Sequence, residues 1–184
     1  MKIFQLWLGE IPEQLNGCPI KECLESVKKM AEANGIEYEL YRKMPDGLEL
    51  PKNTYKDMAN KTDLFRFHML ALNPDWMWVD ADVMWGDKLP ELKEGKAYYD
   101  RRKGYDKPGI GVIINNGDKE LSNNYGKWIV EWKNGPMNTI SSLGGFVLGK
   151  IIKDNLCEII PDGFYNHYRM KSWKTGRIKR NLGL

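Results

Sequence analysis

Segments with the pattern of a β-strand alternate with segments that have the pattern of an α-helix along the first 80 residues, and this alternation constrains the fold most. Residues 2–8 are expected to form a strand, 19–34 a helix and 36–41 a second strand. A second helix that ends near residue 72 and a strand at 76–79 follow. Helices between strands are typical of an open α/β sheet, in which loops at one edge carry function.

The pattern is clearest in the first helix and in the strand after it. Ile20, Leu24 and Val27 recur at helical spacing and therefore share one face, and Gly35 ends the helix. Along residues 36–41, apolar side chains alternate with glutamates, which is the period of a strand. The chain therefore begins in the order strand, helix, strand.

The second half of the chain continues the alternation less regularly. We predict strands at 96–99 and 111–115, a helix at 121–132 and a last strand at 157–160. Residues 141–150 are rich in glycine, and helix and strand both remain open for them. Together the segments predict an α/β fold of the doubly wound kind.

Length and composition favour a single domain over residues 1–184. Of these residues 42% are hydrophobic and 29% charged, as in ordinary globular domains, and a domain of this size folds without disulfides or a structural metal. The three cysteines form no CxxC pair, which favours a reducing compartment. The sequence contains no leader-like or bilayer-spanning apolar run, so we expect a cytoplasmic protein.

Positive charge is concentrated at one end of the sequence. Residues 165–184 contain six basic residues and no acidic one, whereas the formal net charge of the chain is only +3. Such a segment is either a solvated terminus or a contact for phosphate or for an anionic membrane. We expect it to close over a bound diphosphate, with peripheral contact at the inner face of a membrane as the alternative. We expect no nucleic-acid partner.

Two carboxylates directly follow the apolar run at 76–79. Asp80 and Asp82 flank Ala81 where the backbone begins to turn, so their oxygens can converge on one cation. Mg²⁺ and Mn²⁺ take oxygen ligands and are typically held by one or two carboxylates together with substrate phosphates. A surface turn can also contain such acids, but neighbouring carboxylates repel each other unless a cation neutralises them. The pair therefore predicts a metal site for a diphosphate-bearing substrate.

An acid and a base lie on one face of the second predicted helix. Asp63 and Arg66 are three positions apart, so the carboxylate can accept hydrogen bonds from sugar hydroxyls while the guanidinium orients that carboxylate. Helix capping with a surface ion pair is the alternative. The sequence has no GxGxxG and no GxxxxGK[ST] motif, which excludes the glycine-rich phosphate loops of Rossmann dinucleotide sites and P-loop proteins.

Longer runs contain these residues in a recognisable order. Residues 61–70 read KTDLFRFHML, residues 78–83 read WVDADV and residues 2–9 read KIFQLWLG. They resemble the S-D-x-x-R helix, the G-G-x-Y-x-D-x-D strand and the K-I-x-x-x-W-x-G first strand of DXD-containing GT-A glycosyltransferases, with Trp78 in place of the tyrosine. That family includes fungal outer-chain mannosyltransferases, bacterial capsular enzymes and the glucosyltransferase domains of large clostridial toxins.

Further motifs extend the resemblance over nearly the whole chain. Residues 113–116, IINN, match an inner strand of the family that presents an asparagine near the sugar. Residues 134–136, NGP, match a turn before the donor pocket, and residues 166–173 resemble the closing H-x-x-x-x-S-W motif.

The resemblance implies a GT-A fold of minimal size, with a Rossmann-like open mixed sheet flanked by helices. It implies a nucleoside-diphosphate sugar as donor, UDP-linked in preference to GDP-linked, and Mn²⁺ or Mg²⁺ held by Asp80, Asp82 and His167. The residues that it marks as catalytic are Asp63, Arg66, Asp80, Asp82 and Asn115, and those that it marks as donor-binding are Trp7, Leu8, Asp63, Arg66, Trp78, Ala81, Ser172, Trp173 and Lys174.

The same resemblance implies a retaining transfer of a hexose. No second carboxylate is evidently placed as a nucleophile, so we favour a same-face reaction assisted by the leaving group over a covalent glycosyl enzyme. The short chain leaves no room for the insertions that hold a protein acceptor, and we expect a small glycan or a lipid-linked acceptor, as in polysaccharide biosynthesis. The alternatives are a nucleotidyltransferase acting on a sugar phosphate and a non-catalytic nucleotide-sugar-binding module.

Overall fold

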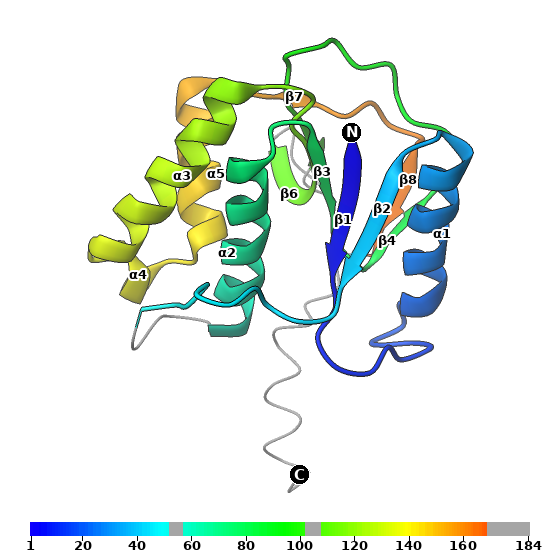
Figure 1. Cartoon of the computed structure of the whole chain (residues 1–184), viewed down its shortest axis with the longest axis horizontal. Helices are drawn as coiled ribbons and strands as arrows, with labels where there is room; N and C mark the ends of the chain where they lie inside the picture. The colour runs from blue at the N-terminus through cyan, green and yellow to red at the C-terminus, as the bar shows by residue number, and fades with distance from the viewer. Residues whose placement is uncertain (52–56, 102–107, 169–184) are drawn as a thin grey trace, which may run out of the picture.

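A mixed β-sheet of six strands forms the centre of the molecule (Figure 1). The structure is a computed structural model that describes residues 1–51, 57–101 and 108–168. The strands of the sheet are β1 (Lys2–Leu6), β2 (Glu37–Tyr41), β3 (Trp76–Val79), β5 (Tyr98–Arg101), β6 (Pro108–Ile114) and β7 (Glu158–Ile159).

The strand order is β2-β1-β3-β6-β5-β7, and the strands do not all run in one direction. β1 is parallel to both β2 and β3, and β5 is parallel to β7. β6 is antiparallel to its neighbours β3 and β5. The reversed β6 places its amino-terminal half, rather than its carboxyl end, beside the carboxyl end of β3.

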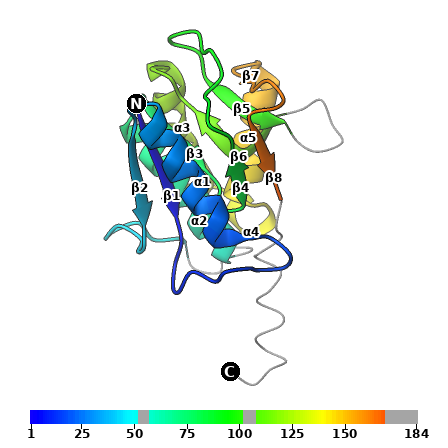
Figure 2. The same cartoon turned by 90° about the vertical axis from the view of Figure 1, so that its right-hand side faces the viewer.

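Helices cover both faces of this sheet, and neighbouring residues of β1 show how (Figures 1 and 2). Phe4 packs into the core formed with α2 (Asp57–Leu72), α3 (Lys119–Asn134) and α5 (Leu143–Asp154), whereas Ile3 packs on the other face with α1 (Ile20–Ala33). A one-turn helix, α4 (Met137–Ile140), precedes α5. None of the helices in the described part of the chain has the length and apolar character needed to cross a bilayer.

A second, two-stranded sheet lies on the α1 side of the molecule and was not expected from the sequence. It pairs β4 (Val83–Trp85) with β8 (Tyr165–His167) in antiparallel register. The rings of Trp85 and Tyr165 stack with their centroids 4.9 Å apart. The backbone N–H of Trp85 donates to Ser26 Oγ of α1 over 2.9 Å. The predicted strand at 157–160 is therefore not the last one, and the basic segment begins with a paired strand.

The glycine-rich segment 141–150, for which two conformations remained open, is largely helical. The first N–H groups of α5 find side-chain acceptors, which offsets the cost that glycine imposes on a helix. Ser142 Oγ accepts from the Gly145 N–H, and Asn60 Oδ1, on α2, accepts from the Leu143 N–H over 2.7 Å. An acceptor on another helix leaves no local sequence pattern.

Phe4 is the centre of an aromatic cluster that joins β1 and β3 to α2. Its side chain is fully buried, and its ring centroid lies 5.9 Å from that of Phe65, 5.5 Å from that of Trp76 and 5.2 Å from that of Trp78. All three pairs are edge-to-face or tilted, and edge-to-face contact is a favoured geometry for aromatic rings.

Replacing this ring tests how far the central cluster stabilises the fold. The Phe4→Ala variant is expected to lose about 3–5 kcal/mol of unfolding free energy, because truncation of a fully buried aromatic side chain removes its apolar contacts and leaves a cavity. Leu72→Ala is the control, since Leu72 is 64% exposed and its loss is expected to cost less than about 0.5 kcal/mol. Urea unfolding followed by tryptophan fluorescence measures both, and equal destabilisation of the two variants would contradict the assignment.

Candidate metal and donor site

The two acids lie in the turn that connects β3 to β4. The Asp80 N–H donates to the Gly111 carbonyl over 2.6 Å, which ties the end of β3 to β6, and Gln5 Nε2 donates to the Asp80 carbonyl over 3.2 Å. The Val83 N–H then donates to the same carbonyl and closes the turn. Both carboxylates thus lie at the carboxyl end of a buried central strand, where ligands bind in open α/β sheets.

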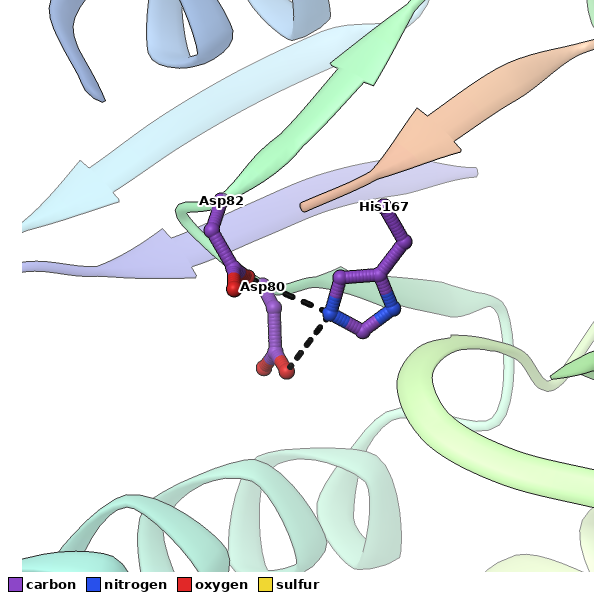
Figure 3. Close-up of side chains that lie close together, drawn as sticks. All are labelled: Asp80, Asp82 and His167. Carbon is purple, nitrogen blue, oxygen red and sulfur yellow. Dashed lines mark ion pairs between the residues drawn. The ribbon is translucent and has the colours of Figure 1, made fainter. Parts of the chain in front are cut away.

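His167 reaches the acids through the small sheet. It is the partner of Val83 in the β4–β8 register, and the next N–H, that of Tyr168, donates to the Asp82 carbonyl over 3.0 Å. Nε2 of His167 lies 3.3 Å from Asp82 Oδ1 and 3.9 Å from Asp80 Oδ2. Figure 3 shows the three side chains converging from β8 and from the β3–β4 turn.

These three side chains suit a hard divalent cation. One ligand atom from each of Asp80, Asp82 and His167 lies within 4.8 Å of the others. Mg²⁺ and Mn²⁺ prefer carboxylate oxygens, and imidazole also suits first-row metals. The Asp80 side chain is 25% exposed, so further oxygen ligands from water or from a diphosphate can reach the same point.

One oxygen of Asp80 is occupied by two donors. Arg66 Nη2 lies 3.2 Å from Asp80 Oδ1, and the Trp78 indole N–H donates to the same oxygen over 2.8 Å. The guanidinium lies 4.8 Å from the centroid of the Trp78 ring, within cation–π range. These contacts fix the carboxylate so that Oδ2 is the oxygen that faces His167.

Asp63 connects the site to α5. Its Oδ1 lies 3.4 Å from Arg66 Nη2, and its Oδ2 accepts from the Gly144 N–H over 2.9 Å. A Cβ on Gly144 would lie 2.6 Å from that oxygen, so only glycine allows the approach. The cap and the ion pair of the alternative interpretation are thus both present, but the cap is on a different helix and the pair is buried. Burial raises the pKa of Asp63, while Arg66 and the Gly144 N–H lower it.

Burial and charge act in opposite directions on the proposed ligands. Burial raises the pKa of Asp80 to about 6, against the lowering effect of Arg66 and with a further raising effect of Asp82. Burial lowers the pKa of His167, but hydrogen bonds to Asp100 and Asp82 and the charges of Asp80 and Asp82 outweigh it and raise the pKa to about 9. Below that pH, and without a metal, the imidazolium is the cation that neutralises the acids.

Asp100, on β5, belongs to this group and was not predicted. Its side chain is fully buried, its Oδ2 lies 3.1 Å from His167 Nδ1, and its Oδ1 accepts from the Gly111 N–H over 2.9 Å. The sequence signal that could have identified Asp100 is its position directly after Tyr98 and Tyr99, which are buried in β5. A charge in a buried strand needs a partner, and His167 supplies one.

Three of the residues predicted to bind the donor lie in two loops: Trp7 and Leu8 follow β1, and Ala81 lies between the two acids. The indole N–H of Trp7 donates to the Glu10 carbonyl over 2.8 Å, and the ring packs on the cluster of Cys18 and α1 to which Ala81 also belongs. Leu8 is exposed beside it. The loop after β1 and the β3–β4 turn therefore contact the same small cluster.

Asn115 is placed differently from its expected position near the sugar. Its side chain is fully buried, and Nδ2 donates to the Leu70 carbonyl over 3.1 Å and to Ser122 Oγ over 2.9 Å. Its N–H pairs with the Trp76 carbonyl at the start of β3, whereas Asp80 follows the end of that strand. Because β6 is antiparallel to β3, Asn115 lies at the opposite edge of the sheet and connects α2 to α3.

The remaining predicted residues, Ser172, Trp173 and Lys174, lie outside the described ranges. Their expected contacts with the nucleoside diphosphate stay predictions.

Gly111 is the position where one added methyl group tests the site. A Cβ there would lie 2.1 Å from His167 Cε1, so Gly111→Ala is expected to displace the ring, to cost about 1–3 kcal/mol of unfolding free energy and to weaken Mn²⁺ binding. Gly149→Ala, in α5, is the control, because nothing lies within 4 Å of its Cβ. Urea unfolding and equilibrium dialysis with Mn²⁺ measure the two effects. Unchanged Mn²⁺ binding by a folded Gly111→Ala protein would contradict this geometry.

Comparison with known proteins assigns the fold. No family model matches the chain, and no curated protein matches it significantly. Among solved structures it is similar to a glycosyltransferase involved in the glycosylation of the major capsid of PBCV-1, with 12% identity and a TM-score of 0.60 over 99% of this chain and 100% of the other. It is also similar to the glycosyltransferase GlyE of Streptococcus pneumoniae TIGR4, with 12% identity and a TM-score of 0.49 over 98% of this chain and 50% of that chain. The first likeness, together with the mixed sheet and its flanking helices, confirms the predicted fold class: the chain has the fold of a glycosyltransferase.

Proposed function

We propose that this protein is a metal-dependent glycosyltransferase that moves a hexose from a nucleoside-diphosphate sugar to a small acceptor. The observation that carries the proposal is the group of Asp80, Asp82 and His167 at the carboxyl end of β3, in a chain with the fold of a glycosyltransferase. Two neighbouring acids repel each other unless a cation neutralises them, so their convergence with an imidazole from a strand far away in the sequence supports a metal site.

Asp80, Asp82 and His167 are the residues that would hold Mn²⁺ or Mg²⁺. When bound, such a cation acts as a Lewis acid that stabilises the negative charge developing on a departing diphosphate. The protein supplies the orientation. Arg66 and Trp78 hold one oxygen of Asp80, which leaves the other directed towards His167.

A retaining reaction on a single face of the sugar is the mechanism that we propose. Apart from the proposed metal ligand Asp82, two further carboxylates of the site already have partners: Asp63 is bound by Arg66 and Gly144, and Asp100 by His167 and Gly111. A covalent mechanism needs a carboxylate free to attack the sugar carbon. The occupied acids therefore support assistance by the leaving group, and an inverted linkage in the product would exclude both retaining routes.

For the donor we propose a UDP-linked hexose, with a GDP-linked one second. Trp7 and Leu8 follow β1 on the side of Ala81, where a base and ribose would extend from a diphosphate at the acids. Ser172, Trp173 and Lys174 are proposed to contact the diphosphate from the basic segment. As acceptor we propose a small glycan or a lipid-linked sugar in polysaccharide biosynthesis, on the cytoplasmic side of a membrane.

Donor hydrolysis tests this function without knowledge of the acceptor. With Mn²⁺ and a panel of UDP- and GDP-sugars, slow release of free sugar is expected from at least one donor. Asp80→Asn and Asp82→Asn are each expected to lower that rate about 100-fold, the equivalent of about 3 kcal/mol of transition-state stabilisation. Asp75→Asn, an exposed acid at the opposite end of β3, is the matched control and should retain the full rate.

The products distinguish the alternatives. Release of pyrophosphate from a nucleoside triphosphate and a sugar phosphate would identify a nucleotidyltransferase, and nucleotide-sugar binding without turnover would identify a binding module. Hydrolysis that persists in both Asp80→Asn and Asp82→Asn would contradict the proposed site.

A further inference from the structure

Asp100 is a fully buried carboxylate on the far side of His167 from the two predicted acids. His167 presents Nε2 to Asp82 and Asp80 and Nδ1 to Asp100, at 3.3 Å, 3.9 Å and 3.1 Å respectively. The imidazole ring thus separates an inner acid from the outer pair. The inner acid has too little exposure to receive a ligand from solvent, so it acts on the site only through its neighbours.

Strand β6 leaves room for His167 and Asp100. A Cβ on Gly111 would lie 2.1 Å from the imidazole, and a Cβ on Gly109 would lie 2.4 Å from Asp100 Oδ1. Two glycines on the same face of one strand therefore leave room for the histidine ring and for the acid behind it. Glycine weakens a strand interior, and a close approach of another group is the usual reason for its presence.

The hydrogen bonds of Asp100 determine which nitrogen of His167 carries the proton. A carboxylate only accepts hydrogen bonds, and Asp100 Oδ1 already accepts from the Gly111 N–H. Its Oδ2 therefore accepts a hydrogen bond from the protonated Nδ1 of His167. In the neutral ring this leaves the lone pair on Nε2, which is the nitrogen that faces the acids, and a metal-bound histidine needs that tautomer.

We propose that Asp100 is a positioning residue that holds His167 in the orientation and tautomer in which Nε2 ligates a divalent cation between Asp80 and Asp82. The inference rests on the metal site of the proposed function and adds to it a residue that has no contact with the metal. The competing explanation is that Asp100 only adds negative charge near the cation.

Asp100→Asn separates these roles because it keeps the size of the side chain. If the amide oxygen keeps its bond to the Gly111 N–H, the amide NH₂ faces Nδ1 and favours the tautomer with a proton on Nε2, which cannot bind a metal. Loss of such an outer partner typically weakens metal binding about 10–100-fold, and we expect that change in the Mn²⁺ dissociation constant. Asp118→Asn is the control: Asp118 caps α3 by accepting from the Leu121 N–H, and asparagine caps as well.

A double-mutant cycle with His167→Ala decides whether Asp100 acts through the histidine. Free Mn²⁺ is measured by electron paramagnetic resonance in wild type, in each single variant and in Asp100→Asn/His167→Ala, with circular dichroism as a check on folding. We expect Asp100→Asn to have no further effect once His167 is absent. An equal loss of affinity with and without His167, or no loss in a folded Asp100→Asn protein, would overturn the proposal.

A measurement on the wild-type protein keeps the proposal testable if Asp100→Asn does not fold. The chain contains only two histidines, His68 and His167, so their ring nitrogens can be assigned by ¹⁵N NMR with Zn²⁺ as a diamagnetic probe. We expect a protonated Nδ1 and a metal-bound Nε2 on His167, and the reverse arrangement would overturn the inference. Wild type that binds neither Mn²⁺ nor Zn²⁺ would overturn the metal site itself. Binding without turnover of any nucleotide-sugar would contradict only the proposed function.

Discussion

Repulsion among the carboxylates around His167 is the physical constraint on which the arrangement of this site depends. Asp80 and Asp82 face one ring nitrogen and Asp100 faces the other, so a positive charge must lie between them. The histidine supplies that charge when it is protonated, and Arg66 supplies a second one at Asp80. A divalent cation can take over the first of these roles, since it needs the same acids as ligands.

The topology of the sheet explains how these groups meet. β3 ends at the acids, and the antiparallel β6 brings its glycines, rather than its carboxyl end, to the same edge. The short β4–β8 sheet then places His167 above those glycines. On the other side of β3, α2 supplies Arg66, whose partner Asp63 also caps α5. Loss of one partner would therefore leave another charge buried and unpaired, which is costly.

Local periodicity was sufficient to predict α1 and β2, a short apolar run predicted the buried strand that ends in the acids, and the resemblance named His167 as the partner of those acids. The two strands of the small sheet were missed because three-residue segments have no measurable period and because the two strands lie far apart in the sequence. Asp100 was missed because a single acid in a strand looks like a surface residue until its partner is known. Asn115 was expected at the wrong edge because a strand's sequence does not reveal its direction, and β6 is reversed relative to β3.

The small sheet has a consequence for the dynamics of the site. β4 and β8 pair over only three residues each, and an isolated two-stranded sheet has little stability of its own. We therefore expect the strand that carries His167 to open at a lower free energy than the strands of the six-stranded sheet. A ligand that bridges this strand to the β3–β4 turn binds only the closed form and shifts the equilibrium towards it. Amide hydrogen exchange at Tyr165 and His167 would slow accordingly. The exchange rates of the β3 amides would stay unchanged, because β3 is already enclosed by the larger sheet.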